Sequence, residues 1–184
     1  MLPQVLLARL EHILGEDYAS VMEAFSHERI GSFRINNLKW DGTDVLSELS
    51  EKWIVIQPFP WLKDVYTFER IHEYALKGTR AFYDGKIYLQ SIASMLPVLA
   101  LDPRASETIL DVCAAPGSKT TQMAMFMGNE GSIVAIEQNQ IRFDKLMYNT
   151  KLQWATIVNW VKSDARKYFE STDVEFDKIL LDAP

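Results

Sequence analysis

The sequence predicts an α/β fold in which a parallel sheet follows a small α+β domain. Two observations lead to this prediction. Beyond about residue 102, short apolar strands alternate with helical segments, and this alternation is typical of parallel βαβ units. The first hundred residues instead mix short helices and strands without a regular alternation. We therefore expect two domains, residues 1–101 and residues 102–184.

In the first domain, the spacing of apolar residues predicts two short helices followed by a small sheet. One helix is expected up to Gly15 and another from Asp17 to about His27. The remaining expected elements are, in order, a strand at 32–39, a turn at Asp41-Gly42, a helix beginning at 45–49, a strand at 53–56, and a strand at 86–89 that leads into an apolar run before Asp102-Pro103.

The second domain is expected to contain four strands and two well-marked helices. The strands are predicted at Ile109–Val112, Ile133–Ile136, Thr156–Val161 and Lys178–Leu181. Ser118 is a suitable N-cap for a helix that ends before Gly128, and Asn139 is a suitable N-cap for the next helix. In such a sheet the carboxyl ends of the strands lie along one edge, where open α/β sheets bind their ligands.

The composition is that of a soluble globular protein and limits the partners of the chain. Of its 184 residues, 48% are hydrophobic and 24% are charged, as in proteins with an ordinary core. The net charge of −6 predicts that any contact with nucleic acid is local. The single cysteine and the lack of an apolar run of about 18 residues predict neither a disulfide nor a membrane span. We expect a cytoplasmic protein without a metal site.

The loop after the first strand of the second domain is the strongest candidate for ligand binding. Between Thr108 and Thr120, a strand leads into small residues and then into a helix. Small residues let the backbone approach a ligand, and free N–H groups near Ser118 attract an anion. The common G-x-G-x-x-G pattern is absent. The spacing also disfavours a P-loop, because Ser118 and Val112 stand where its Lys and first Gly are required.

Three acidic residues follow the next three strands, namely Glu137, Asp164 and Asp182. Since the carboxyl ends of parallel strands meet at one edge, we expect these acids to converge on the loop. Glu137 lies 20 residues after Gly117, the spacing at which such folds bind ribose hydroxyls. A single acid at such a position is as well explained by helix capping, but three at successive strand ends favour a ligand that carries a ribose.

Four segments resemble the Sun/RsmB-type RNA (cytosine-5) methyltransferases. The segment LDVCAAPGSKTTQMA at 110–124 closely resembles the cofactor motif of that family, and GKIYLQSIASMLPVLALDP at 85–103 resembles the run into it. SFRINNLK at 32–39 resembles the family's Arg-x-Asn strand, and LLDAP at 180–184 resembles the start of its Asp-Ala-Pro-Cys motif. The resemblance implies an incomplete class I (Rossmann-like) methyltransferase sheet, preceded by a small α+β domain resembling an RNA-binding domain.

The resemblance also implies a cofactor, S-adenosyl-L-methionine, and a role for each matching residue. The methionine part would be held by Cys113, Ala114, Ala115, Pro116, Gly117, Ser118 and Lys119. Glu137 would bind the ribose and Asp164 the adenine amino group, while Asp182 would lie beside the methyl group and orient the target cytosine. The family's nucleophile is a cysteine of a later Thr-Cys motif that these residues lack, and Cys113 belongs to the cofactor loop instead.

The implied function is therefore methylation of cytosine C5 in ribosomal or transfer RNA, with this chain expected to be a catalytically incomplete fragment. Two alternatives remain open at this point. One is a non-catalytic module that binds RNA or the cofactor, favoured for this chain by the missing cysteines. The other is a methyltransferase that acts on a different class of substrate.

The expected contacts with RNA rest on a segment that interleaves cations and aromatic residues. Residues 77–88 carry three cations and three aromatics, a mixture that can neutralise phosphates and stack bases. The candidates are Lys77, Arg80, Lys86 and, from the first strand, Arg34. The competing interpretation is that the aromatics belong to the core and the cations are merely solvated.

Overall fold

A computed structural model of the protein describes residues 3–26, 29–39 and 42–183, and the chain divides into two compact units, 1–30 and 31–184. The first unit holds α1 (Gln4–Leu14), the 3-10 turn η1 (Gly15–Asp17) and α2 (Tyr18–Ser26). The two helices expected in this region are confirmed. The expected end of the second helix, His27, lies outside the described residues.

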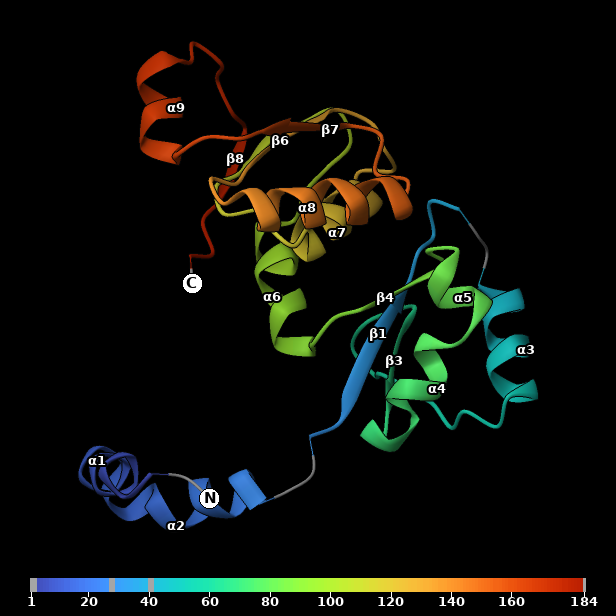
Figure 1. The fold of residues 1–184 in the computed structure, drawn as a ribbon, viewed down its shortest axis with the longest axis vertical. Coiled ribbons are helices and arrows are strands. Elements are labelled where there is room, and N and C mark those ends of the chain that lie inside the picture. The colour runs from blue at the N-terminus through green and yellow to red at the C-terminus, as the bar shows by residue number, and fades with distance from the viewer. Residues whose placement is uncertain (1–2, 27–28, 40–41, 184) are drawn as a thin grey trace. The chain divides into compact units, whose positions relative to one another are not determined.

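The second unit begins with a four-stranded antiparallel sheet in the order β2-β3-β1-β4. Its strands are β1 (Gly31–Ile35), β2 (Gln57–Pro58), β3 (Val65–Phe68) and β4 (Ile87–Leu89). Its helical elements are α3 (Thr43–Glu51), η2 (Arg70–His72), α4 (Glu73–Lys77) and α5 (Arg80–Tyr83), which lie along one side of the sheet in Figure 1. Phe33 and Ile35 of β1 pack there against Val45 and Leu49 of α3, so this small sheet has a core of its own.

The strand predicted at 53–56 is wrong. These residues form the turn that leaves α3: Trp53 has a positive φ of 57°, and the N–H of Ile54 donates to the carbonyl of Leu49. Ile54, just after the end of α3, is buried in the small core. In the sequence, such an apolar residue at a helix end resembles part of a buried strand. The neighbouring strands are β2 and β3 instead. The turn expected at Asp41-Gly42 falls partly on a residue outside the described ones.

The second sheet is entirely parallel, in the order β7-β6-β5-β8, and it confirms the predicted α/β class. Its strands are β5 (Thr108–Asp111), β6 (Ser132–Ile136), β7 (Val158–Val161) and β8 (Lys178–Leu180), within two residues of the predicted bounds. Its helices are α6 (Ile92–Leu101), α7 (Ser118–Phe126), α8 (Gln140–Leu152) and α9 (Ala165–Ser171). The alternation of strand and helix thus places every βα connection at the carboxyl edge of the sheet.

The two faces of the parallel sheet are covered unequally. Helices α7 and α8 lie below the sheet in Figure 1 and α9 lies above it. Met123 of α7 and Leu146 of α8 are fully buried against Ile109 and Ile133. The opposite face packs only against α9 and neighbouring residues, and β8 at the sheet edge leaves Ile179 half exposed. The well-packed face therefore fixes the loops that open at the carboxyl edge.

Polar side chains join the two sheets inside the second unit. Asn36, just after β1, donates from Nδ2 to the carbonyl of Gln153 at 2.8 Å. Gln90, after β4, donates from Nε2 to Oε1 of Gln122 on α7 at 2.8 Å. The domain boundary predicted near Asp102 falls within this unit, at the C-cap of α6, and it stays a prediction.

Candidate functional site

The loop between β5 and α7 is built from small, well-packed residues. Ala114 and Ala115 are both buried, and the Ala115–Pro116 peptide bond is cis. Gly117 caps α7 with a φ of +100°, a conformation open to glycine. A Cβ on Gly117 would lie 3.2 Å from Leu146 Cδ1 of α8. The loop therefore follows a close path that a larger side chain would obstruct. Ser118, expected as the cap, is instead the first residue of the helix.

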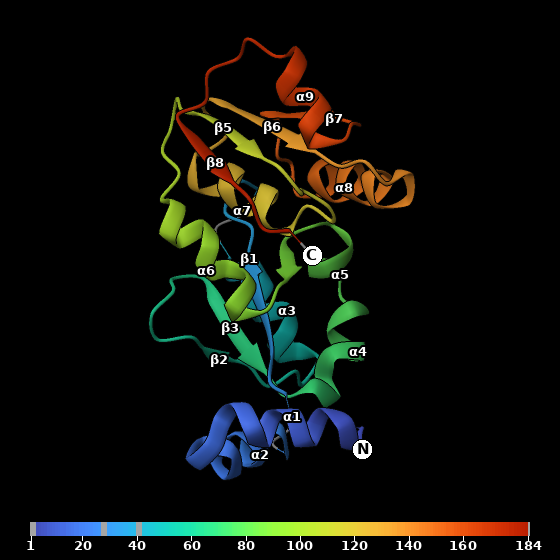
Figure 2. The ribbon, with the colours of Figure 1, turned by 90° about the vertical axis from the view of Figure 1, so that its left-hand side faces the viewer.

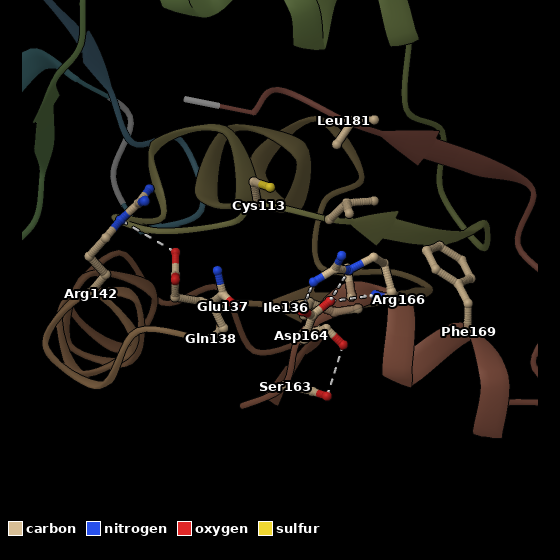
Figure 3. Close-up of a pocket in the computed structure, with 12 residues that line it drawn as sticks. Cys113, Ile136, Glu137, Gln138, Arg142, Ser163, Asp164, Arg166, Phe169 and Leu181 are labelled. Carbon is tan, nitrogen blue, oxygen red and sulfur yellow. Dashed lines mark hydrogen bonds and ion pairs between the residues drawn. The ribbon is translucent and has the colours of Figure 1, made fainter.

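Two neighbouring cavities open at this loop. The larger has a volume of about 490 Å³ and lies at the ends of β5, β6 and β7, where Figure 3 shows its side chains. The smaller, of about 210 Å³, lies over the loop and the start of α7. Cys113 and Arg142 line both cavities. The two cavities lie side by side along the carboxyl edge of the parallel sheet, and we call the pair the strand-end pocket.

Glu137 follows β6 and is 5% exposed in the larger cavity. Its Oε1 accepts a hydrogen bond from the N–H of Asn139 at 2.8 Å, and its Oε2 lies 3.4 Å from Arg142 Nε (Figure 3). Arg142 Nη2 in turn donates to the carbonyl of Ala115 at 2.8 Å. These contacts fix the carboxylate of Glu137 beside the loop after β5.

Asp164 lines the same cavity from β7 and serves as the N-cap of α9. Its Oδ1 accepts from the N–H of Arg166 at 2.9 Å, and its Oδ2 pairs with Arg166 Nη2 at 2.6 Å. These hydrogen bonds, first from the guanidinium and then from the backbone, lower the pKa of Asp164 to about 2. Asp164 is therefore an anion at neutral pH, and its carboxylate oxygens are hydrogen-bond acceptors.

Asp182 follows β8 and lines the smaller cavity. Its Oδ2 forms an ion pair of 2.5 Å with Lys119 Nζ, and Lys119 also donates to Ser94 Oγ at 3.1 Å. The three acids expected to converge thus all line the strand-end pocket, Glu137 and Asp164 in its larger cavity and Asp182 in its smaller one.

The sequence reasoning missed two residues that shape the pocket. Asp111, the last residue of β5, is buried in the smaller cavity and accepts a hydrogen bond of 2.7 Å from Thr120 Oγ1. It also ends a strand with an acid, so the rule that selected Glu137 would have found it. Arg142 carried no such signal, because only the packing of α8 brings it to the loop.

Cys113, the single thiol, is poorly suited to act as a nucleophile. Burial raises its pKa above the ordinary value, and the carboxylates of Glu137 and Asp111 raise it further. Because the thiolate is the reactive form, this environment keeps the sulfur protonated and unreactive at neutral pH.

The four cations expected to contact RNA do not form one surface. Arg34 is 1% exposed, so its expected contact with RNA is wrong for this structure: the guanidinium lies between the two sheets and donates from Nη2 to Thr121 Oγ1 at 2.6 Å. Lys77 pairs with Glu73, Lys86 lies 3.9 Å from Asp44, and Arg80 is exposed at the start of α5. A polar side chain on a strand usually faces water, and only the packing of the two sheets buries Arg34.

The described part of the chain contains neither a metal-binding cluster nor a membrane-spanning helix. No group of three or more His, Cys, Asp or Glu side chains there could hold a metal ion. Likewise, none of the helices in residues 3–26, 29–39 and 42–183 is long and apolar enough to cross a membrane.

Two families match almost the whole chain. Residues 2–92 match the N-terminal domain of 16S rRNA methyltransferase RsmF, and residues 98–184 match 16S rRNA methyltransferase RsmB/F. A tRNA (cytosine(49)-C(5))-methyltransferase of Pyrococcus abyssi is 38% identical over 153 residues, 83% of this chain and 49% of the relative. Ribosomal RNA small subunit methyltransferase F of Shewanella sediminis is 36% identical over 157 residues, 83% of this chain and 33% of the relative. The chain thus spans half or less of these curated relatives.

Solved structures agree with the fold. A methyltransferase homolog protein from Pyrococcus horikoshii is 32% identical with a TM-score of 0.85, over 100% of this chain and 59% of that one. NSun6 from Pyrococcus horikoshii, solved with SFG, is 21% identical with a TM-score of 0.87, over 99% of this chain and 70% of that one. The second likeness shows the fold alone. The predicted class, a methyltransferase-like parallel sheet after a small α+β domain, is confirmed.

Proposed function

Because the chain belongs to the Sun/RsmB-type family of RNA (cytosine-5) methyltransferases, we propose that it supplies the S-adenosyl-L-methionine site for methylation of cytosine C5 in RNA. The relatives named above are a tRNA and a ribosomal RNA methyltransferase, so the proposed substrate is one of these RNAs. A substrate of another class is disfavoured by the same relatives.

One observation carries the cofactor proposal: the small-residue loop and three acids from successive strands line one pocket. The cofactor is a nucleoside joined to an amino acid through a sulfonium, and the strand-end pocket has matching parts. In the larger cavity Glu137 is suited to accept hydrogen bonds from the ribose hydroxyls, and Asp164 from the adenine amino group. In the smaller cavity the loop from Cys113 to Lys119 is suited to hold the methionine part.

The charges in the smaller cavity suit the reacting end of such a ligand. When bound, the cofactor supplies an electrophilic methyl group on a positively charged sulfur. Asp182 forms an ion pair with Lys119 beside this end of the pocket, where its carboxylate is suited to orient a cytosine. We assign Asp182 this orienting role, and we assign no nucleophilic role to Cys113, whose raised pKa keeps the sulfur protonated.

The cofactor site is tested by calorimetric titration of the 184-residue chain with S-adenosylhomocysteine. Replacing Glu137 by Ala removes a buried anionic acceptor, and we expect binding to weaken roughly tenfold or more. Glu130→Ala is the matched control, because Glu130 is exposed just before the other end of β6 and should leave the affinity unchanged. Equal affinity of the Glu137→Ala variant and the unaltered chain would reject the cofactor assignment, provided both melt cooperatively.

We further propose that this chain alone does not catalyse methyl transfer to RNA. A transfer assay with labelled methyl groups and cytosine-containing RNA should give no product, because its single cysteine lies in the cofactor loop with a raised pKa. Methyl transfer at the level of a complete relative would show that the chemistry needs no further cysteine.

A further inference from the structure

We propose that a groove between the small sheet and α8 binds a base of single-stranded RNA, with a backbone phosphate beside Lys77. The groove has a volume of about 360 Å³, and the residues that matter for the proposal are Lys77, Phe82, Tyr83, Tyr88, Tyr148 and Asn149. It shares no lining residue with the strand-end pocket. The inference rests on the proposed function only for the choice of RNA as the polymer, and we call this feature the tyrosine groove.

The aromatic residues of the groove are exposed where a base can reach them. Tyr83 of α5 is 66% exposed and Tyr148 of α8 is 64% exposed, and both views show α5 beside α8 (Figures 1 and 2). Neither ring belongs to a hydrophobic core cluster, whereas Phe82 packs against the small core. Tyr83 touches Phe82 edge to face, with the ring centroids 6.0 Å apart, but most of its surface and most of that of Tyr148 stays open to the groove. Exposed aromatic rings of this kind are stacking platforms for nucleic-acid bases.

Tyr88 gives the groove a fixed aromatic wall. Its ring is half-buried, and the guanidinium of the buried Arg34 lies 5.0 Å from the ring centroid. The Nδ2 of Asn149 lies 3.4 Å from the Tyr88 hydroxyl and 2.7 Å from the carbonyl of Pro116. Side chains from β4 and α8 are thus held together, and Asn149 connects the tyrosine groove to the loop of the strand-end pocket.

Gln153, which lines the groove, has one buried polar atom whose hydrogen bonding is incomplete. Gln153 is 2% exposed and its Nε2 donates to the carbonyls of Gly85 and Ile87, both at 3.1 Å. Its Oε1 is a buried acceptor without a donor among the described residues. An unpaired buried acceptor is unfavourable, and the exocyclic amino groups of adenine, cytosine and guanine are donors of the kind it lacks.

The local charge favours a phosphate next to the base. Glu73 is the acid of the groove, and its carboxylate is paired with Lys77 Nζ at 2.6 Å and with Arg70 Nε at 3.4 Å. Two cations therefore face one carboxylate. Lys39 adds a third cation nearby, because its Nζ donates to the carbonyl of Leu152, a groove residue, at 3.0 Å and to the carbonyl of Asp84 at 3.4 Å. The local count is then three cations and two acids, Glu73 and Asp84. In a chain with a net charge of −6, this local excess of cations is where a polyanion is expected.

The test measures fluorescence anisotropy of a labelled single-stranded RNA of mixed sequence with the full 184-residue chain at low salt. Replacing both Tyr83 and Tyr148 by Ala should weaken binding roughly tenfold or more, since each stacked base loses its platform. The double replacement by Phe keeps the rings and should restore most of the affinity. Tyr74→Ala is the control, because Tyr74 is 90% exposed on α4 and does not line the groove.

A second ligand separates base from phosphate. An abasic oligomer with the same number of phosphates should bind the unaltered chain several times more weakly than the RNA does. The proposal is overturned if the Ala variant binds as tightly as the unaltered chain, if Tyr74→Ala weakens binding equally, or if the abasic oligomer binds as tightly as RNA.

Calorimetry with S-adenosylhomocysteine on the same variants keeps the two proposals apart. The groove variants should retain the cofactor affinity of the unaltered chain, which also shows that they are folded. If the unaltered chain does not bind S-adenosylhomocysteine, the proposed cofactor function is rejected. The RNA-binding result for the tyrosine groove is not affected by that outcome.

Discussion

Asp111 is a buried carboxyl whose ionisation is coupled to folding. Burial raises its pKa from 3.8 to about 6, against the opposing effects of the hydrogen bond from Thr120 and the charge of Lys119. The folded chain therefore binds this proton more tightly than the unfolded chain does. Between about pH 4 and pH 6, the contribution of Asp111 to the free energy of unfolding falls as the pH rises.

Replacing Asp111 by Asn should remove this pH dependence while retaining an oxygen that accepts from Thr120. We expect the variant to gain stability relative to the unaltered chain from pH 4 to pH 7, by at most about 3 kcal/mol. Urea unfolding at several pH values measures the difference. The exposed Asp173, replaced by Asn, is the control and should give a constant difference. A constant difference for the Asp111 variant as well would contradict the raised pKa of the buried carboxyl.

At the scale of elements, the β5–α7 connection decides the shape of the strand-end pocket. Its backbone must turn sharply from the strand into the first turn of α7, and Gly117 makes that turn with a φ of +100°. Leu146 of α8 closes the space beside it. The loop therefore depends on the positive φ of Gly117 and on its close approach to Leu146. Both favour a residue without a side chain at position 117.

Gly117→Ala tests this dependence. We expect a loss of about 1–2 kcal/mol in the free energy of unfolding from the backbone conformation, together with weaker binding of S-adenosylhomocysteine because the loop must move away from Leu146. Gly128→Ala is the control, since Gly128 also has a positive φ of 62° but nothing within 4 Å of an added Cβ. It should lose similar stability and keep its ligand affinity. If both variants bound the ligand equally well, the close packing at Gly117 would not matter for the pocket.

The elements were predictable where local signals are strong. Asn139 caps α8 as expected, with its side chain accepting from the N–H of Arg142 at 3.1 Å, and apolar runs located all four parallel strands. Two of the short elements were not found: β2 has two residues and α5 has four. Such segments are too short to show a period, and their conformation is set by the neighbours they pack against.

At the scale of the whole second unit, Arg34 links the two sheets. Its Nε donates to Gln90 Oε1 at 3.0 Å and its Nη2 to Thr121 Oγ1 at 2.6 Å, although its side chain is fully buried and burial lowers its pKa to about 10. The side chain is still a cation at neutral pH, and it replaces its hydration by donating hydrogen bonds to Gln90, beside the small sheet, and to Thr121 of α7. The small sheet and α7 are therefore expected to unfold together.

Replacing Arg34 by Ala should cost about 2–4 kcal/mol, because acceptors on both sides are left buried without a donor. Urea unfolding followed by two probes, tryptophan fluorescence and far-UV circular dichroism, should also lose its single transition. Arg34→Lys keeps the charge without the planar fork and should recover only part of the loss. Arg80→Ala, at an exposed position on α5, should change stability by about 0.5 kcal/mol or less. A neutral effect of Arg34→Ala would show that the two sheets do not depend on Arg34 to stay together.

The sequence by itself determined the parallel sheet, the loop from Cys113 to Lys119 and the three acids at the strand ends of that sheet. Helices and strands are recognised from local periodicity, and their alternation along the chain implies that the strands are parallel. Only the tertiary structure decided that Arg34 is a buried link and that Tyr83 and Tyr148 share a groove. The reason is physical: a side chain's exposure depends on what packs over it, and here the covering or facing elements come from distant parts of the chain.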